Sequence, residues 1–301
     1  MQKDVIQPKS WVLGACILPG IAWYVYVVIL PMITAMRNSL YNWSGGPKMT
    51  YIGFKNYQFL MRDSIFWQAF RNNLTITLLS LIGQIGFAFI LSSLLAMRFV
   101  RLKRLHRTVA YFPSTVSAVV VGYVWSVIFN YDSGLLNSLL RAVGLESWAS
   151  PWLDIPSSIM YVVSIPIIWQ YIGYYMIIIL AGISSIDQEV YDMAEIDGAN
   201  GVQRALKITL PLIKGTLGVC VMLCISGNMR IFDHIYSLTG GGPGNSSIVM
   251  AMHAYKTTFI KSQFGYASAM SFGIMVLSLS LIMFSRVLIQ QPWRKEAAID
   301  A

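Results

Sequence analysis

The chain has 301 residues, a formal net charge of +9, 56% hydrophobic residues and only 12% charged residues. Soluble domains carry about 25% charged residues, and half that share cannot cover a surface that faces water. The composition therefore excludes an ordinary soluble domain and a disordered chain. It predicts an integral membrane protein that crosses the bilayer several times.

Six stretches are apolar enough to cross the bilayer as helices. About 20 helical residues span the hydrocarbon core, with a usable range of roughly 17–25. The stretch before Met229 reaches this length if Lys214 lies at the membrane interface. The first stretch stands where a signal peptide would, but its length and its two prolines favour a retained span. The predicted spans are residues 11–33, 74–97, 109–129, 157–180, 209–228 and 266–287.

One further charge-free stretch, residues 234–255, is not predicted to span. It contains the run Gly240-Gly241-Gly242-Pro243-Gly244. The backbone of such a run cannot satisfy its own hydrogen bonds in lipid. We expect it to form a loop outside the bilayer.

A basic cluster between the second and third predicted spans sets the expected topology. A short loop with many cations resists translocation, so we place this loop in the cytoplasm. An even number of spans then places both termini in the cytoplasm. The cluster lies beside anionic lipid headgroups in this interpretation, and we expect no nucleic acid partner. Its cations are Arg98, Arg101, Lys103, Arg104 and Arg107.

The sequence lacks the motifs of the common catalytic and metal sites. It has no Gly-x-x-x-x-Gly-Lys-Ser/Thr loop, no Gly-x-Ser-x-Gly elbow and no His-Glu-x-x-His pair. The three histidines lie in different loops, and the three cysteines (Cys16, Cys220 and Cys224) lie in apolar stretches, which favours unpaired thiols. We therefore expect no enzyme activity, no metal site and no cofactor in this chain.

The loop at residues 181–208 concentrates acidic residues on the predicted cytoplasmic side. We predict a first short helix capped by Asp187 and ended by Gly198 in the left-handed conformation. A second helix is expected from Asn200 to Pro211. Such a hairpin is suited to bind a soluble partner, although a plain solvated connector is the alternative. The apolar face of the first helix is expected to hold Ile186, Val190, Met193 and Ala194.

This loop resembles the EAA signature of ABC importer permeases. The signature is Glu-Ala-Ala, three residues, Gly, nine residues and Ile-x-Leu-Pro. Here Asp192 replaces the Glu and Met193 the first Ala, while the spacing matches throughout. The resemblance assigns contact with the ATPase subunits to Asp192, Met193, Ala194, Glu195, Asp197, Gly198, Ile208, Leu210 and Pro211.

Further segments resemble carbohydrate permeases related to the maltose and glycerol-phosphate systems. These are residues 51–57, Phe66-Trp67 with Asn72-Asn73, and the segment from Phe232-Asp233 to Pro243. The resemblance implies an all-α integral membrane protein of the type I importer permease kind, with six transmembrane helices and a cytoplasmic coupling hairpin. Residues 1–301 would form a single transmembrane permease domain in the bacterial plasma membrane.

The resemblance also implies partners. A second permease subunit would pair with this one, and two cytoplasmic ATPase subunits would bind ATP and Mg²⁺ in place of this chain. An extracytoplasmic binding protein would deliver a sugar or oligosaccharide. A polyol or a phosphorylated glycerol stays open as the solute.

Amides and tyrosines near the middle of the predicted spans are the candidate substrate contacts. Gln84 and Gln170 lie at mid-span, where a polar group should face protein or a watery path. Tyr174 lies one helical turn from Gln170 on the same face. The resemblance favours Gln170, Tyr171, Tyr174 and Asn228 as pathway residues. The alternative is that these residues only form hydrogen bonds between helices.

Two other functions are weaker candidates. A secondary transporter would be expected to carry intramembrane carboxylates for ion coupling, and the five full-length charge-free stretches have none. A membrane enzyme would need a nucleophile with a base, or a metal site, and the sequence shows no such group.

Overall fold

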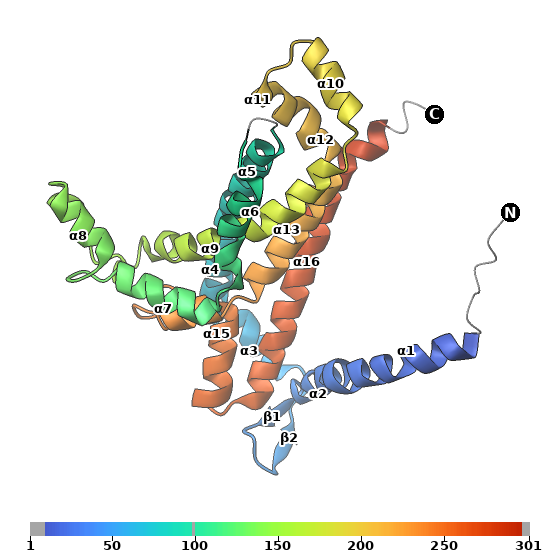
Figure 1. Ribbon diagram of the computed structural model, residues 1–301. Helices are drawn as coiled ribbons and strands as arrows, with labels where there is room; N and C mark the ends of the chain where they lie inside the picture. Colours follow the sequence, from blue (N-terminus) through green and yellow to red (C-terminus); the bar gives the residue numbers. More distant parts are fainter. Residues whose placement is uncertain (1–9, 98–99, 297–301) are drawn as a thin grey trace. The chain divides into compact units, whose positions relative to one another are not determined.

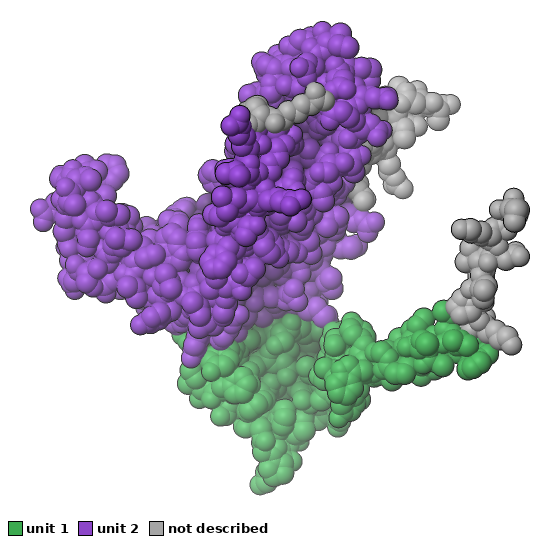
Figure 2. All heavy atoms as spheres, viewed as in Figure 1, with its two compact units in different colours: residues 1–62, 254–273 green, residues 63–253, 274–301 purple. Residues whose placement is uncertain are grey.

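The computed structural model describes residues 10–97 and 100–296, and side chains as far as residue 288. The predicted cation Arg98 and the extreme termini lie outside the described residues, as do the side chains of the last basic residues. The described chain is helical apart from one short β-hairpin (Figure 1). It divides into two compact units, residues 1–62 with 254–273 and residues 63–253 with 274–301 (Figure 2).

Unit 1 begins with one long apolar helix. It consists of α1 (Ser10–Tyr24), the π-helical turn η1 (Val25–Ile29) and α2 (Leu30–Asn38). The stretch Trp11–Asn38 is long and apolar enough to cross a membrane, and none of its apolar window is buried within the chain. Its apolar side chains are therefore left for lipid or for another subunit to cover.

The rest of unit 1 contains a short β-hairpin and a helix that is held by side-chain hydrogen bonds. Strands β1 (Tyr41–Trp43) and β2 (Met49–Tyr51) pair antiparallel, with Tyr41 opposite Tyr51. The Asn56 amide of α3 (Lys55–Arg62) donates to the carbonyls of Ser39 and Tyr41 at 2.7 and 3.0 Å. These bonds join α3 to the end of α2. Unit 1 is completed by η6 (Lys256–Ile260) and the first part of α16 (Phe264–Glu296).

Unit 2 is built around two long helices. The first runs without a break over 33 residues through α4 (Ser64–Ser80), the π-helical turn η2 (Leu81–Ile85) and α5 (Gly86–Ala96). The second is α9 (Ile159–Ser184), and α13 (Lys214–Met229) packs against both. Their shared core includes Ala88, Met176, Ile179, Cys220 and Cys224. All three cysteines are free thiols, as predicted.

The third predicted span, residues 109–129, is not one straight helix. The structure has α6 (Lys103–Tyr111), the 3-10 turn η3 (Phe112–Thr115) and α7 (Ala118–Ile128), with a bend of 95° between the two halves. Pro113 begins the tight turn, and Val116 and Ser117 follow with extended backbone. Two extended residues cannot continue a helical ladder, so the chain changes direction there.

The fifth predicted span, residues 209–228, is also divided. The hairpin helix over Gly201–Leu212 meets α13 at Ile213 with a bend of 75°. In the described chain four helices are long enough to cross a membrane, and the number rises to six if each bent pair counts as one span. The predicted spans near 11–33, 74–97, 157–180 and 266–287 correspond to the four long helices.

Two segments predicted to lie outside the membrane hold short helices. The segment expected to be a loop at 234–255 holds α14 (Asp233–Leu238), a turn through the glycine run and α15 (Met250–Tyr255). Helix α8 (Leu135–Ala142) and the 3-10 turn η4 (Glu146–Trp148) lie between α7 and α9. The prediction that residues 234–255 form no single helix is confirmed.

The contact between α6 and α9 depends on Gly173. A Cβ at this position would overlap the backbone carbonyl of Ala110 and lie 2.7 Å from Tyr111 Cα. Backbone atoms cannot move aside as the end of a flexible side chain can. Gly173 therefore allows the first half of the bent helix to lie directly on α9.

We predict that Gly173→Ala lowers the stability of the protein by about 1–3 kcal/mol, the usual cost of overpacking. The matched control is Gly86→Ala, because a Cβ at Gly86 meets nothing within 4 Å. This control should leave stability unchanged or slightly raised. Thermal unfolding of the purified variants in detergent measures both. Equal melting temperatures for the two variants would contradict the proposed close approach of α6 and α9.

Candidate functional site

A cavity of about 360 Å³ in unit 2 brings together residues that are far apart in the sequence. Four predicted substrate residues line it: Gln84, Tyr171, Tyr174 and Asn228. They come from η2, α9 and α13. The aromatic residues Tyr175 and Phe232 line the cavity together with the two predicted tyrosines.

The amides in this cavity are held by hydrogen bonds to backbone carbonyls, one on a neighbouring helix and one in the same helix. Gln84 Nε2 donates to the Ile167 carbonyl at 3.1 Å. Asn228 Nδ2 donates to the Cys224 carbonyl at 3.0 Å. Both side chains are almost fully buried. A buried amide with a satisfied donor is fixed in orientation, so these groups present a rigid polar edge.

Gln170 lies outside the lining of this cavity. Its Nε2 donates to the Val116 carbonyl at 2.8 Å, and its Oε1 meets Nε2 of His234 at 2.5 Å. Val116 precedes the N-cap of α7, so its carbonyl has no place in the helical ladder. Gln170 thus supplies the missing donor at the bend. Of the five predicted pathway residues, Gln170 is the one that does not line the cavity, and its contacts match the alternative of bonding between helices.

Several cavity residues were not predicted from the sequence. Arg230, Asp233 and His234 follow Asn228 within a few residues and line the same space. The Arg230 guanidinium donates to the carbonyl and hydroxyl of Ser226 at 3.1 and 3.3 Å. Burial lowers the pKa of His234 to about 4, and the neighbouring Asp233 carboxylate opposes this only partly.

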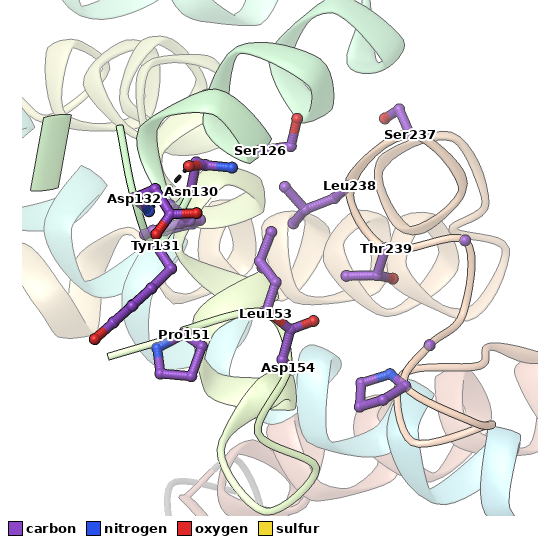
Figure 3. A pocket seen from close by; sticks show the side chains of 14 residues that line it. Ser126, Asn130, Tyr131, Asp132, Pro151, Leu153, Asp154, Ser237, Leu238 and Thr239 are labelled. Carbon is purple, nitrogen blue, oxygen red and sulfur yellow. Dashed lines mark hydrogen bonds between the residues drawn. The ribbon is translucent and has the colours of Figure 1, made fainter. Parts of the chain in front are cut away.

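A second cavity, of about 540 Å³, lies among the segments expected outside the membrane. Its polar side chains include Asn130, Asp132, Asp154 and Thr239 (Figure 3). None of the predicted pathway residues lines it. Although it is larger, it is formed by loops and short helices, so we place the candidate substrate site in the smaller cavity between the long helices.

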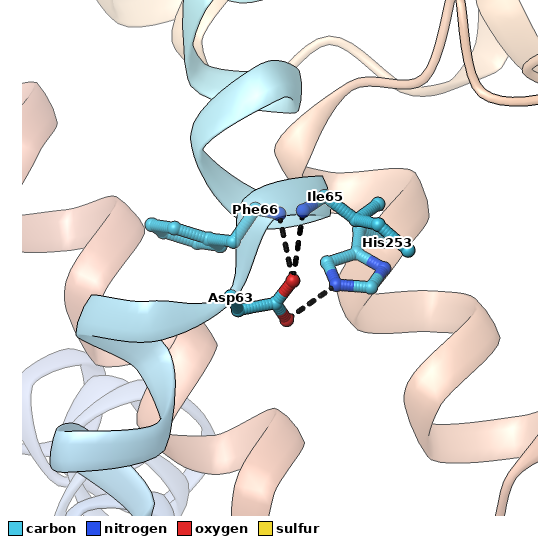
Figure 4. Close-up of polar contacts among 4 residues, drawn as sticks. All are labelled: Asp63, Ile65, Phe66 and His253. Atoms are coloured by element: carbon cyan, nitrogen blue, oxygen red, sulfur yellow. Dashed lines mark hydrogen bonds and ion pairs between the residues drawn. The ribbon is translucent and has the colours of Figure 1, made fainter.

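The start of α4 is joined to the last outer segment by polar side chains. The Asp63 carboxylate accepts from the backbone N–H groups of Ile65 and Phe66 at 2.9 and 3.1 Å, and its other oxygen lies 2.9 Å from Nε2 of His253 (Figure 4). Further along α4, Asn73 makes a second contact with this segment. Its Oδ1 accepts a hydrogen bond from the backbone N–H of Met250 at 2.9 Å.

The other end of the Asn73 amide reaches the cavity. Its Nδ2 donates to the Asn228 carbonyl at 2.8 Å. One side chain therefore connects the segment after the glycine run to a residue of the cavity. A movement of that segment would therefore displace Asn73 and, through it, the backbone at Asn228.

The acidic hairpin has the predicted helix–turn–helix form. Helix α10 (Gln188–Ile196) ends at Gly198, which has φ +76°. The Ala199 N–H donates to the Ala194 carbonyl and the Gly198 N–H to the Glu195 carbonyl, which is the Schellman arrangement. Asn200 then caps the second helix in a reciprocal capping box with Gln203. The prediction for Gly198 is confirmed.

One detail of the hairpin differs from expectation. Asp187 precedes α10 with extended backbone, but its side chain accepts no bond from the helix, so the predicted side-chain cap is wrong. Met193, which was predicted on the apolar face of the first helix, is 58% exposed, whereas Ala194 is buried. The Tyr191 hydroxyl, 3.0 Å from Thr209 Oγ1, ties the two helices together.

Exposed apolar side chains mark the outer face of the hairpin. Ile196 is 85% exposed and Val202 68%. The hairpin also carries acidic side chains, and Glu195 forms an ion pair with Arg204 near solvent, with 3.4 Å between the two charged groups. Of the predicted contact residues, Asp192, Met193, Glu195, Asp197, Gly198, Leu210 and Pro211 are exposed, Ile208 is half-buried and Ala194 is buried.

Among the side chains that the structure describes, within residues 10–97 and 100–288, no group of three or more His, Cys, Asp or Glu is placed to hold a metal ion. The cavity offers aromatic faces, fixed amides and a few polar groups. This is a set for binding a small polar molecule, without a nucleophile and base aligned for chemistry.

Comparisons with known proteins agree with this interpretation. The family model described as "Binding-protein-dependent transport system inner membrane component" matches residues 84–294. The Bacillus subtilis (strain 168) protein named "Probable ABC transporter permease protein YurN" is 35% identical over 267 residues, which cover 88% of this chain and 91% of that one. The lactose transport system permease protein LacF of Rhizobium radiobacter is 30% identical over 287 residues, or 94% and 95% of the two chains.

A solved structure shows the same fold. It is the crystal structure of a bacterial alginate ABC transporter in complex with a periplasmic protein that holds an alginate pentasaccharide. The match has a TM-score of 0.80 and 25% identity, and it covers 91% of this chain and 92% of that chain. The predicted resemblance to carbohydrate-uptake permeases and the all-helical membrane fold are confirmed. The chain therefore belongs to the binding-protein-dependent transport system inner membrane component family, and it is the multi-pass permease subunit of an ABC importer rather than an enzyme.

Proposed function

We propose that this permease carries a sugar or oligosaccharide and that the solute passes through the 360 Å³ cavity. The observation that carries the proposal is the meeting of Gln84, Tyr171, Tyr174 and Asn228 around one space. Sugars bind well to aromatic faces combined with fixed amides, and the cavity supplies both. Relatives named for the transport of lactose and of multiple sugars support the same class of solute.

The acidic hairpin is the proposed contact with the ATPase subunits. Two such subunits would bind ATP and Mg²⁺, since this chain has no phosphate-binding loop. The exposed apolar side chains Met193, Ile196 and Val202 would fill a recess on the ATPase, with carboxylates around them. The Schellman turn at Gly198 and the capping box at Asn200 would make the hairpin rigid enough to transmit movement of the ATPase subunits to the membrane helices.

A second permease subunit and an extracytoplasmic binding protein complete the proposed assembly. The first apolar helix, which buries none of its apolar window within the chain, has surface available for a second permease or for lipid. The hairpin lies on the ATPase side, so both termini are cytoplasmic in this proposal, as the basic cluster near Arg101 and Arg104 also favours.

The solute class is tested by transport into proteoliposomes that contain the complete importer with both permeases, the ATPases and the binding protein. We expect uptake of at least one sugar among lactose, diacetylchitobiose and maltotriose, driven by ATP. Uptake of glycerol 3-phosphate is measured for comparison, because the Arg230 guanidinium in the cavity could bind a phosphate group. Uptake of glycerol 3-phosphate alone would contradict the sugar proposal. The isolated chain, as a control, should hydrolyse no ATP.

The hairpin proposal predicts that Gly198→Val uncouples ATP hydrolysis from transport. Residues with a branched Cβ are penalised at positive φ, so the second helix would be misdirected. Gly198→Asn is the matched control, because Asn tolerates the left-handed conformation. We expect at least a tenfold loss of transport per ATP for the first variant and a small change for the second. Normal coupling in Gly198→Val would mean that the hairpin is only a connector.

The cavity proposal predicts different effects for two neighbours on α9. Tyr174→Ala removes an aromatic face from the cavity and should slow transport at least fivefold with little loss of stability. Gln170→Ala leaves the Val116 carbonyl without its donor and should lower stability by about 1–3 kcal/mol. Transport assays and thermal unfolding of both variants separate the two roles. Wild-type transport by Tyr174→Ala would remove the cavity from the pathway.

A further inference from the structure

The hydrogen bonds of Gln170 determine which ring nitrogen of His234 carries the proton. The Val116 carbonyl can only accept, so the Gln170 amide nitrogen faces it at 2.8 Å. The Gln170 oxygen therefore faces Nε2 of His234. An amide oxygen cannot donate, so Nε2 of His234 carries the hydrogen and donates it.

The other nitrogen, Nδ1, is then a bare acceptor. Burial keeps the ring neutral at physiological pH, since the pKa of His234 is lowered to about 4. The ionisable side chains that share the cavity are Asp233, Arg230, Cys224 and the tyrosines Tyr171, Tyr174 and Tyr175. Of these, Asp233 is the one that acts on the ring charge, in opposition to burial.

Nδ1 also has access to the cavity. It makes no hydrogen bond within the part of the chain that the structure describes. The fully enclosed polar side-chain atoms without a partner in that part are Ser93 Oγ, Arg107 Nε and Thr257 Oγ1, and Nδ1 is not among them. His234 lines the 360 Å³ cavity, and we infer that Nδ1 faces this space.

The two amide oxygens in the cavity are partly engaged. The Gln84 oxygen faces the Cys224 thiol, with 3.6 Å between oxygen and sulfur. The Asn228 oxygen lies 3.5 Å from the Ser80 hydroxyl. The His234 ring, in contrast, lies beside the Tyr171 ring, with 6.1 Å between ring centres. An open acceptor beside an aromatic face is suited to a sugar ring that lies on the face and donates a hydroxyl.

We propose that Nδ1 of His234 accepts a hydrogen bond from a hydroxyl group of the sugar in transit, which makes His234 a specificity-determining residue of this permease. The proposal rests on the proposed function, because it requires the sugar to enter this cavity. It gives Gln170 a positioning role, since its amide holds the ring in the tautomer that leaves Nδ1 free to accept.

Two substitutions of His234 test the roles of its two ring nitrogens separately. His234→Gln keeps an N–H donor near Nε2, able to meet Gln170, but has no acceptor at the place of Nδ1. His234→Asn keeps an acceptor near Nδ1 and gives up the bond to Gln170. The pair therefore separates solute recognition from packing against α9.

Transport is measured in proteoliposomes of the complete importer at saturating loaded binding protein, so that the rate reports events in the membrane. The probes are the sugar transported fastest among lactose, diacetylchitobiose and maltotriose, and its monodeoxy derivatives. We expect His234→Gln to lower the maximal rate about tenfold, the usual effect of one lost hydrogen bond to a solute. His234→Asn should stay within about threefold of wild type. One monodeoxy sugar should be transported slowly by wild type and no more slowly by His234→Gln.

The Tyr174→Ala variant separates the ways in which the proposals could fail. Wild-type rates in both Tyr174→Ala and His234→Gln would overturn the proposed function. A slow Tyr174→Ala with a wild-type His234→Gln would overturn only the role of His234.

A measurement without solute tests the tautomer itself. The chain has three histidines, so ¹⁵N spectra of histidine-labelled permease are simple, and the His234 signals are those lost in His234→Gln. We expect a protonated Nε2 and a bare Nδ1 at about pH 6. A proton on Nδ1 would overturn the proposal whatever the transport data show.

Discussion

A backbone carbonyl that leaves a helix within a membrane protein must find a donor from its own protein, because lipid offers none. The structure meets this requirement at Val116, where α6 and η3 end and α7 turns away by 95°. The Gln170 amide donates to that carbonyl from α9. Without this bond the bend would expose an unsatisfied polar group at a cost of several kcal/mol in an apolar medium. The bend is therefore tied to one side chain on the neighbouring helix.

Other features of unit 2 follow from the same bend. Gly173 lets α6 lie on α9 just beside Gln170, and Gly122 leaves room on α7 for Ser237 of α14. Helix α14 is thereby held against α7 and α9, where its His234 reaches Gln170. The cavity forms beside these contacts. Its amides are fixed by hydrogen bonds to backbone carbonyls, and Tyr171 and Tyr174 line it beside them.

The sequence predicted some of these features and not others, for physical reasons. Gly198 was predictable because a glycine between two short amphipathic helices has few other uses, and its φ of +76° agrees. Apolar length identified the four long helices. It could not show the bends, because a window without charge measures composition and not direction. Pro113, followed by Ser114 and Thr115, was the available signal of a break.

The polar residues show a similar limit. Gln170 and Tyr174 share a helix face by spacing, but spacing could not tell that one bonds to Val116 while the other lines a cavity. His234 was missed because a histidine in an outer loop, far from the other two in sequence, gave no pattern to detect. Only the fold brings it to Gln170, which is 64 residues away in the chain.

The central claim is that the sugar occupies the cavity lined by Tyr171, Tyr174 and Asn228 during transport. Cryo-electron microscopy of the complete importer, trapped with an ATP analogue and the loaded binding protein, locates the solute directly. The account predicts sugar density against the two tyrosines, with a hydroxyl within hydrogen-bonding distance of His234. Sugar density that lies elsewhere in the membrane region, with this cavity empty, would contradict it.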